Sequence, residues 1–408
     1  MKKITIDGRR RLQGEISVSG SKNAVLPIIF ACILTNGISE IRNTPDIGDV
    51  SVALEILSSL GAKIHTRENV TLIDTRNLGY NTPSAESVSK IRASTYLIGS
   101  CLSRFGICHI LPFGGCDFAT RPIDMHLSAC RDFGGRVEGN LITADGLFGN
   151  KISLRLPSVG ATVNAILLAA SAKGDSLIEG CATEPHIDSL IEFINSCGGM
   201  VERHGDKIFV SGRELHGGSI DIFGDMIEAG SYIAAGIVTE SEIAIKNCPT
   251  DQMSSVLSAF SDMGARFDID GSTIHTRFGG AFRHLQIRAE PYPGFPTDLQ
   301  PIMSAVMACT MGGEIYDFVW KNRFGYLDKL ALFGVKYMRN NDSALIFPSN
   351  IHSASVIAPD LRGGMACVLC ALSAEGRSEI DSVNIILRGY EKLTEKLSRL
   401  GAQIKVVN

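Results

Sequence analysis

The sequence predicts an α/β protein with two lobes, built from six repeats of a β-α-β-α-β-β unit, three repeats per lobe. The first observation is a glycine that recurs six times, about 64 to 73 residues apart, after a helix-like stretch and before a strand. The six copies are Gly61, Gly134, Gly198, Gly264, Gly334 and Gly401. A glycine just past a helix supplies the left-handed residue that closes it, so its physical role is the same in each copy.

The second observation is the amphipathic helix that ends at each of these glycines. Residues 49–60 carry apolar side chains at helical spacing, and Asp49 is expected to be the N-cap. The same pattern is found at residues 187–197, 251–263, 323–333 and 390–400. Each repeat is therefore expected to hold one such helix in addition to a more apolar one, for example at residues 161–172.

The third observation is a hairpin after the glycine. Residues 136–138 and 141–143 alternate in polarity around Gly139-Asn140, and residues 266–269 and 273–275 do so around Asp270-Gly271. A strand before the apolar helix and another after it complete the unit, for example residues 153–156 and 176–178.

The sixth repeat stops at residues 403–407 with half of its hairpin. Residues 4–6, residues 14–18 and the helix from Lys22 match the missing parts, and unpaired strand edges are unfavourable. We therefore expect the N-terminus to return and complete the last repeat. The lobes are expected at residues 22–227 and at 228–408 plus 1–21, with the two chain crossings between them acting as a hinge.

Composition excludes several classes of function. A net charge of −4 disfavours a nucleic-acid-binding surface, and no run of about 18 apolar residues predicts a membrane span. The first residues lack the apolar core of a signal peptide, and most of the eleven cysteines sit in apolar stretches, which indicates reduced thiols in the cytoplasm. The nine histidines have no ligand spacing, and Cys367-x-x-Cys370 lies in an apolar helical run, so no metal site is predicted.

Cations recur at the expected starts of helices, where the helix dipole would favour acids. They are Lys22, Arg92, Arg121, Arg323, Arg362 and Arg388. Because equivalent helices of a repeat point the same way, these cations are expected to gather at one end and form an anion site. Ordinary surface arginines remain the alternative for any one of them.

Two residues are candidates for chemical reactivity. Cys116 lies in a Gly-rich loop five residues before Arg121, and both a cation and a helix N-terminus lower the pKa of a thiol. The loop by itself also fits an incidental cysteine. Asp298 follows Phe295-Pro296-Thr297 and fits either an N-cap or a carboxylate base that faces a cleft.

These motifs together resemble the enolpyruvyl transferases, and the resemblance extends from Leu12 to Ala402. The matching segments are Gly20-Ser21-Lys22-Asn23-Ala24, Arg92-Ala93-Ser94, Gly114-Gly115-Cys116, Arg121-Pro122-Ile123-Asp124-Met125-His126, Ser158-Val159-Gly160-Ala161-Thr162, Phe295-Pro296-Thr297-Asp298, Asn322-Arg323-Phe324, Asp360-Leu361-Arg362 and Arg388-Gly389-Tyr390-Glu391. The Cys116 loop is similar to the branch that uses UDP-N-acetylglucosamine as acceptor, whereas the shikimate-pathway branch lacks it. The resemblance implies a two-lobed inside-out α/β barrel (prism).

The resemblance also implies the chemistry. Enolpyruvate would move from phosphoenolpyruvate to the sugar 3′-hydroxyl by addition and elimination of phosphate, in the first committed step of peptidoglycan precursor synthesis, without a metal or another cofactor. It assigns Cys116 as the general acid and Asp298 as the base for the hydroxyl. Lys22, Arg121 and Arg388 would hold the phosphate, and Arg323 and Arg362 the carboxylate. The nucleotide sugar would contact Asn23, Arg92, Arg121, Pro122, Ile123, Asp124, Met125, His126, Ser158, Val159, Gly160 and Asp298.

The chain also departs from the family pattern. Phe113 lengthens the Cys116 loop, Gly48 stands where Lys is common, and Trp320-Lys321 replaces an apolar-Glu pair. Residues 325–328 likewise lack the usual Met-His-Val. A paralogue with another acceptor and a catalytically silent nucleotide-sugar-binding homologue are therefore the alternatives.

Overall fold

The computed structural model describes residues 2–114 and 122–407. The chain forms two compact units. We call residues 20–114 with 122–223 the first unit, and residues 2–19 with 224–407 the second unit. The chain passes between the units at residues 19–20 and 223–224. The hinge expected near these two places stays a prediction.

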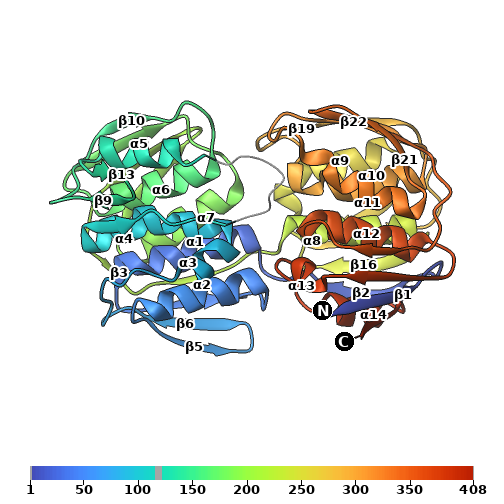
Figure 1. Cartoon of the computed structure of the whole chain (residues 1–408), viewed down its shortest axis with the longest axis horizontal. Helices are drawn as coiled ribbons and strands as arrows, with labels where there is room; N and C mark the ends of the chain where they lie inside the picture. The colour runs from blue at the N-terminus through green and yellow to red at the C-terminus, as the bar shows by residue number, and fades with distance from the viewer. Residues whose placement is uncertain (1, 115–121, 408) are drawn as a thin grey trace. The chain divides into compact units, whose positions relative to one another are not determined.

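Three four-stranded sheets form the rim of the second unit, and Figure 1 shows its helices lying between them. In strand order the sheets are β23-β24-β1-β25, β17-β18-β16-β2 and β19-β20-β22-β21. The strands are β1 (Lys3–Asp7), β2 (Gln13–Ser17), β16 (Glu242–Lys246), β17 (Arg266–Asp270), β18 (Thr273–Arg277), β19 (Leu285–Ala289), β20 (Gly313–Asp317), β21 (Lys336–Arg339), β22 (Ser343–Phe347), β23 (Ser355–Ile357), β24 (Arg377–Asp381) and β25 (Gln403–Val407).

Three helices fill the centre of this unit and pack on one another. They are α8 (Met226–Val238), α10 (Gln300–Cys309) and α12 (Leu361–Ser373). Nearly all their residues are buried, because each helix is predominantly apolar and is enclosed by the rest of the unit. The outer helices are η3 (Thr250–Gln252), α9 (Ser254–Asp262), η4 (Thr297–Leu299), η5 (Arg323–Tyr326), α11 (Leu327–Leu330), η6 (Ala331–Phe333), α13 (Val383–Ile386) and α14 (Leu393–Arg399).

The first unit repeats this plan, with one shorter sheet among its described residues. Its sheets are β15-β4-β6-β5, β10-β11-β13-β12 and β7-β9-β8, with a small pair β14-β3. The strands are β3 (Thr35–Asn36), β4 (Ile38–Arg42), β5 (Lys63–Arg67), β6 (Val70–Asp74), β7 (Ile107–His109), β8 (Arg136–Glu138), β9 (Leu141–Thr143), β10 (Lys151–Ser153), β11 (Asp175–Glu179), β12 (Met200–His204), β13 (Lys207–Ser211), β14 (Leu215–His216) and β15 (Ser219–Asp221).

The central helices of the first unit are α1 (Lys22–Ala31), α4 (Leu97–Phe105) and α6 (Val159–Ala170). Around them lie η1 (Cys32–Leu34), α2 (Gly48–Ser59), α3 (Ala85–Lys90), η2 (Arg92–Tyr96), α5 (Asp124–Asp132) and α7 (Pro185–Ser196). The predicted fold is therefore confirmed: each unit holds three pairs of inner and outer helices, with its sheets outside them.

All six repeat-marking glycines have the left-handed backbone that the sequence predicts. Their φ angles lie between 89° and 101°. At Gly264 a side chain is excluded by space as well, since a Cβ there would lie 2.1 Å from the carbonyl oxygen of Ala281. The hairpin turns are also confirmed, with Gly139 and Gly271 at positive φ.

The N-terminus completes the sixth repeat, as predicted. Strand β1 pairs with both β24 and β25, and Ile4 stands opposite Ile380 on one side and Val406 on the other. The expected places of residues 14–18 and of the helix from Lys22 in that repeat are wrong. Helix α1 belongs to the first unit, where it packs on α2 and α7. Strand β2 pairs in parallel with β16 of the fourth repeat, while β15 pairs with β4 of the first. The first and fourth repeats thus exchange their leading strands, because the chain changes units directly after each of them.

Two local predictions about helix starts are corrected. Asp49 is not the N-cap of α2; Ile47 takes that position with an extended backbone, and the Asp49 side chain instead pairs with Lys22. The helix expected from residue 390 begins at Leu393, because Lys392 has a left-handed backbone with φ of 47°. Arg388 consequently lies in a turn rather than at a helix start. No helix within residues 2–114 and 122–407 is both long and apolar enough to span a bilayer.

Candidate active site

The second unit holds a carboxylate between two buried arginines. Asp298 lies in η4, inside a turn rather than at its N-cap, which is Pro296. Its Oδ1 accepts a hydrogen bond from Nη2 of Arg323 at 2.8 Å, and its Oδ2 accepts one from Nε of Arg362 at 3.2 Å. Arg323 is 6 % exposed and Arg362 is 2 % exposed, so both cations depend on nearby anions. Of the two readings of Asp298, the N-cap is therefore wrong.

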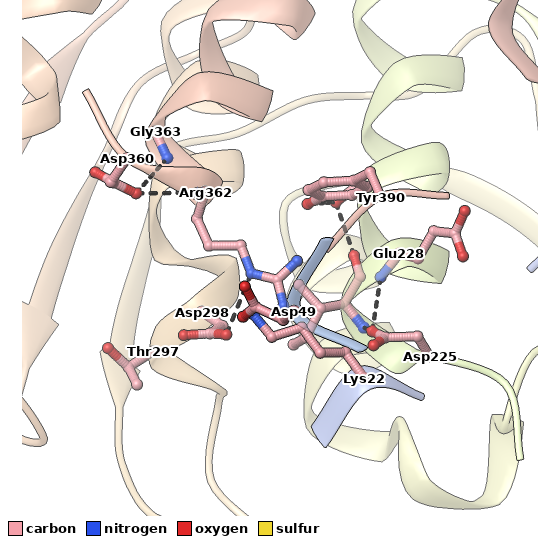
Figure 2. A network of polar contacts seen from close by, with 12 residues as sticks. Lys22, Asp49, Asp225, Glu228, Thr297, Asp298, Asp360, Arg362, Gly363 and Tyr390 are labelled. Atoms are coloured by element: carbon pink, nitrogen blue, oxygen red, sulfur yellow. Dashed lines mark hydrogen bonds and ion pairs between the residues drawn. The ribbon is translucent and has the colours of Figure 1, made fainter. Parts of the chain in front are cut away.

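Arg362 is held from three sides. Asp360 caps α12 by accepting from the backbone N–H groups of Arg362 and Gly363, which places the arginine in the first turn. Its guanidinium carbon lies 5.2 Å from the ring centre of Tyr390, and Figure 2 shows the side chain between Tyr390 and Asp298. Burial alone would lower the pKa of Arg362, but Tyr390, Asp298 and Asp225 raise it above its ordinary value.

The terminal nitrogens of Arg362 are available to a ligand. Nη1 and Nη2 are buried and have no hydrogen-bond partner among residues 2–114 and 122–407. A buried, unsatisfied guanidinium edge is costly, so it normally marks a position for water or an anion. The two nitrogens match the fork geometry with which arginine binds a carboxylate.

Beside this group lies a buried ion pair that the sequence did not predict. Lys396 of α14 donates to Glu228 Oε1 at 2.6 Å and to Ser19 Oγ at 2.7 Å. The backbone N–H of Ser19 donates to Glu228 Oε2 at 2.8 Å. Burial raises the pKa of Glu228, and the positive charge of Lys396 opposes that rise. No motif in the sequence indicated this pair, although Ser19 lies close to the chain crossing that was expected between residues 21 and 22.

In the first unit, Lys22 begins α1 and pairs with Asp49 at 2.9 Å. Asp49 is 5 % exposed and Lys22 is 16 % exposed, so the ammonium is more accessible than its partner. Asn23 follows at the same helix start and is partly buried. The start of α1 thus carries a partly buried cation that is paired with a buried acid.

A second group of the first unit surrounds the N-terminus of α6. Ser158 is its N-cap and accepts from the N–H of Ala161. The His126 ring lies against Gly160, where an added Cβ would meet its Nε2 at 2.8 Å. Burial lowers the pKa of His126 to about 4, and the positive charge of Arg92 adds to the effect. Sequence reasoning placed these four residues in one site, and the structure brings them together on this unit.

The other predicted site residues occupy varied positions. Asp124 begins α5 and pairs with Arg155, and Met125 follows it in the same helix. Pro122 is exposed, while Ile123, Val159 and Arg388 are partly buried. Cys116 and Arg121 lie outside the described residues. The structure also places Thr297, which belongs to the Phe295-Pro296-Thr297-Asp298 segment, against Arg323. Thr297 in turn contacts Asp317, which no motif indicated.

Each unit therefore carries its own set of cations near helix starts, where the backbone N–H groups also favour negative charge. The described residues contain no cluster of three or more potential metal ligands. Such an arrangement can bind anions and, through Asp298, can accept a proton.

Comparison with known proteins gives a family for the chain. Residues 6–397 match the family described as EPSP synthase (3-phosphoshikimate 1-carboxyvinyltransferase). The chain is 36% identical to UDP-N-acetylglucosamine 1-carboxyvinyltransferase 2 of Carboxydothermus hydrogenoformans, over 100% of both chains. It is 37% identical to UDP-N-acetylglucosamine 1-carboxyvinyltransferase 1 of Clostridium acetobutylicum, again over 100% of both.

Solved structures agree on the fold. The enolpyruvyl transferase NikO from Streptomyces tendae has a TM-score of 0.89 at 23% identity, with 100% of this chain and 99% of that chain covered. EPSP synthase from Acinetobacter baumannii has a TM-score of 0.76 at 18% identity, with 100% of both chains covered.

Proposed function

Because the chain belongs to the EPSP synthase (3-phosphoshikimate 1-carboxyvinyltransferase) family, we propose that it transfers enolpyruvate from phosphoenolpyruvate to the 3′-hydroxyl of UDP-N-acetylglucosamine, releasing phosphate. The acceptor rests on the full-length relatives of that name, which are 36–37% identical. This reaction would supply peptidoglycan precursors in the cytoplasm. The observation that carries the proposed chemistry is the Asp298 carboxylate held between two buried arginines.

In this proposal Arg323 and Arg362 bind the carboxylate of phosphoenolpyruvate. Arg362 contacts Asp298 through Nε, so its two terminal nitrogens can receive a second carboxylate without breaking that contact. Arg323, which reaches Asp298 with Nη2, would neutralise the same group. Lys22, Arg121 and Arg388 would hold the phosphate, whose two negative charges require several cations.

The reaction then needs one base and one acid. Asp298 removes the proton of the sugar hydroxyl, and the hydroxyl oxygen bonds to carbon 2 of phosphoenolpyruvate while carbon 3 gains a proton from Cys116. Loss of a proton from carbon 3 and departure of phosphate restore the double bond. Cys116 is also the residue proposed to form a covalent phospholactoyl adduct.

The nucleotide sugar is assigned to the first unit. We propose that Asn23, Arg92, the segment from Arg121 to His126 and the α6 start at Ser158, Val159 and Gly160 hold it. The neutral, buried His126 supports this, because an uncharged ring with a nitrogen unpaired among the described residues can bond a ligand hydroxyl or amide. Asp298 is assigned to the sugar hydroxyl as its base.

One specific observation favours a second candidate, a family member with another acceptor. Trp320-Lys321 departs from the family pattern directly beside Arg323. The experiment is phosphate release from phosphoenolpyruvate with UDP-N-acetylglucosamine or shikimate 3-phosphate as acceptor. Release with the nucleotide sugar alone supports the proposal. Release only with shikimate 3-phosphate, or with neither acceptor, would contradict it.

A further inference from the structure

Asp317 is a buried acid at the end of β20 that no part of the proposed mechanism uses. Only 2 % of it is exposed, and its two oxygens accept three hydrogen bonds in total. Its Oδ2 accepts from the hydroxyl of Thr297 at 2.6 Å. Its Oδ1 accepts from the backbone N–H groups of Val319 and Trp320, both at 2.9 Å.

Thr297 connects Asp317 to Arg323 of the proposed site. Its Oγ1 accepts from Nη1 of Arg323 at 2.7 Å, while Nη2 of the same guanidinium donates to Asp298 at 2.8 Å. Both terminal nitrogens of Arg323 thus donate to Thr297 and Asp298, which are neighbours in one turn. The planar fork cannot rotate without breaking one of the two bonds.

We propose that Asp317 is a positioning residue that acts through Thr297 on Arg323. This inference rests on the proposed function, because Arg323 is assigned there to the carboxylate of phosphoenolpyruvate. A carboxylate only accepts hydrogen bonds, so it forces the Thr297 hydroxyl to donate. The remaining lone pairs of Oγ1 then face the arginine, which fixes the direction of the guanidinium.

An amide at residue 317 would disturb this order. With its oxygen on the Val319 and Trp320 N–H groups, its NH₂ group would face the Thr297 hydroxyl, which then has no acceptor there. With the amide turned round, the NH₂ group would face the two backbone donors. Only a carboxylate satisfies all three donors, so the acid is required by the geometry.

The test compares variants of the full chain in the phosphate-release assay. Thr297→Val removes the hydroxyl and keeps the shape, and it is expected to lower kcat/KM for phosphoenolpyruvate by about 10- to 100-fold, mainly through KM. Thr297→Ser restores the hydroxyl and should lie within about threefold of the wild type. Asp317→Asn should match the valine variant.

Asp328→Asn is the matched control. Asp328 belongs to the same repeat and also accepts from a hydroxyl and an arginine, those of Tyr337 and Arg339. It has no contact with Thr297 among the described residues, so KM for phosphoenolpyruvate should stay unchanged. The KM for the acceptor should change less than about threefold in the Thr297 and Asp317 variants.

A double variant gives the decisive result. If Asp317 acts through Thr297, the double variant Thr297→Val with Asp317→Asn should have the same kcat/KM for phosphoenolpyruvate as the less active single variant, within about threefold. Multiplicative losses, or a serine variant as poor as the valine one, would overturn the proposal. The serine and valine pair decides the matter even if Asp317→Asn does not fold.

Calorimetric binding of phosphoenolpyruvate separates this inference from the proposed function. A chain that shows no turnover with UDP-N-acetylglucosamine would overturn the proposed acceptor. If its binding of phosphoenolpyruvate is still weakened by Thr297→Val and not by Asp328→Asn, the role of Asp317 stands. Equal binding in all variants would overturn the role of Asp317 instead.

Discussion

The guanidinium carbon of Arg362 lies 5.2 Å from the centre of the Tyr390 ring, and both side chains are buried. The Tyr390 hydroxyl shares a hydrogen bond of 2.7 Å with Ser231 of α8. A cation above a desolvated aromatic ring is attracted by its negative face. The ring therefore restricts the orientation of the guanidinium, which lies between Tyr390 and Asp298 (Figure 2).

Two substitutions of Tyr390 should distinguish the contribution of the ring from that of the hydroxyl. Tyr390→Phe keeps the ring and is expected to cost about 1 kcal/mol of unfolding free energy through the lost hydrogen bond. Tyr390→Leu removes the ring, and the cost should rise to about 2–4 kcal/mol with a higher KM for phosphoenolpyruvate. Urea denaturation and steady-state kinetics measure both effects. Equal KM values in the two variants would show that the ring does not orient Arg362.

His126 should make stability depend on pH. Burial lowers its pKa from 6.5 to about 4, so the unfolded chain binds the proton more readily than the folded one. The contribution is present above pH 6.5 and is lost as the pH falls toward 4, by up to about 3 kcal/mol. His126→Gln cannot titrate, so the difference in unfolding free energy between wild type and variant should shrink from pH 7 to pH 4. A constant difference would contradict the lowered pKa.

Asp298→Asn should affect both chemistry and stability. The amide cannot take the hydroxyl proton, so turnover is expected to fall by on the order of 10²–10⁴-fold. Because Arg323 and Arg362 are buried against this carboxylate, the variant should also lose about 2–4 kcal/mol of unfolding free energy. Phosphate release and urea denaturation measure the two losses. Asp328→Asn serves as the control, and a variant with full turnover would exclude Asp298 as the base.

Cys116 is expected to react before every other thiol. The ten described cysteines are free, and nine of them are buried. Burial raises the pKa of Cys130 to about 12 and that of Cys309, the one partly buried thiol, to about 11, so few thiolates form at neutral pH.

Iodoacetamide and the epoxide antibiotic fosfomycin should therefore both label Cys116, which peptide mass spectrometry can check. Cys116→Ser should abolish the fast phase of labelling. Rapid modification of any of the ten described cysteines in the folded protein would contradict this expectation.

Two repeat-marking glycines should differ in their tolerance of alanine. Gly401 has φ of 92° and open space around an added Cβ, so Gly401→Ala is expected to cost about 1–2 kcal/mol through backbone strain alone. At Gly264 the Cβ would also meet the Ala281 backbone, which should raise the cost of Gly264→Ala to about 2–5 kcal/mol. Thermal and urea denaturation measure both, and equal costs would contradict the steric argument.

Much of the fold could be predicted because it follows from local patterns. Helical spacing of apolar residues, the glycine that ends each outer helix and the turn residues of each hairpin act within a few positions of the chain. The half-finished hairpin at residues 403–407 even indicated the return of β1, because a strand edge needs a partner. The exchange of β2 and β15 between repeats was not predicted. Both strands are short and each has one buried residue between exposed ones, so either strand could pair at either sheet edge.

The sequence indicated the types of residue at the candidate site but not the contacts that they make. Arginine and lysine at expected helix starts indicated an anion site, and the sequence by itself determined which residues carry the positive charge. Only the tertiary structure decided their partners. Asp49 pairs with Lys22 instead of capping its helix, Asp298 joins Arg323 to Arg362, and Asp317 reaches Arg323 through Thr297. These contacts join residues of different helices and strands, where distance and burial set the energy and no local periodicity records them.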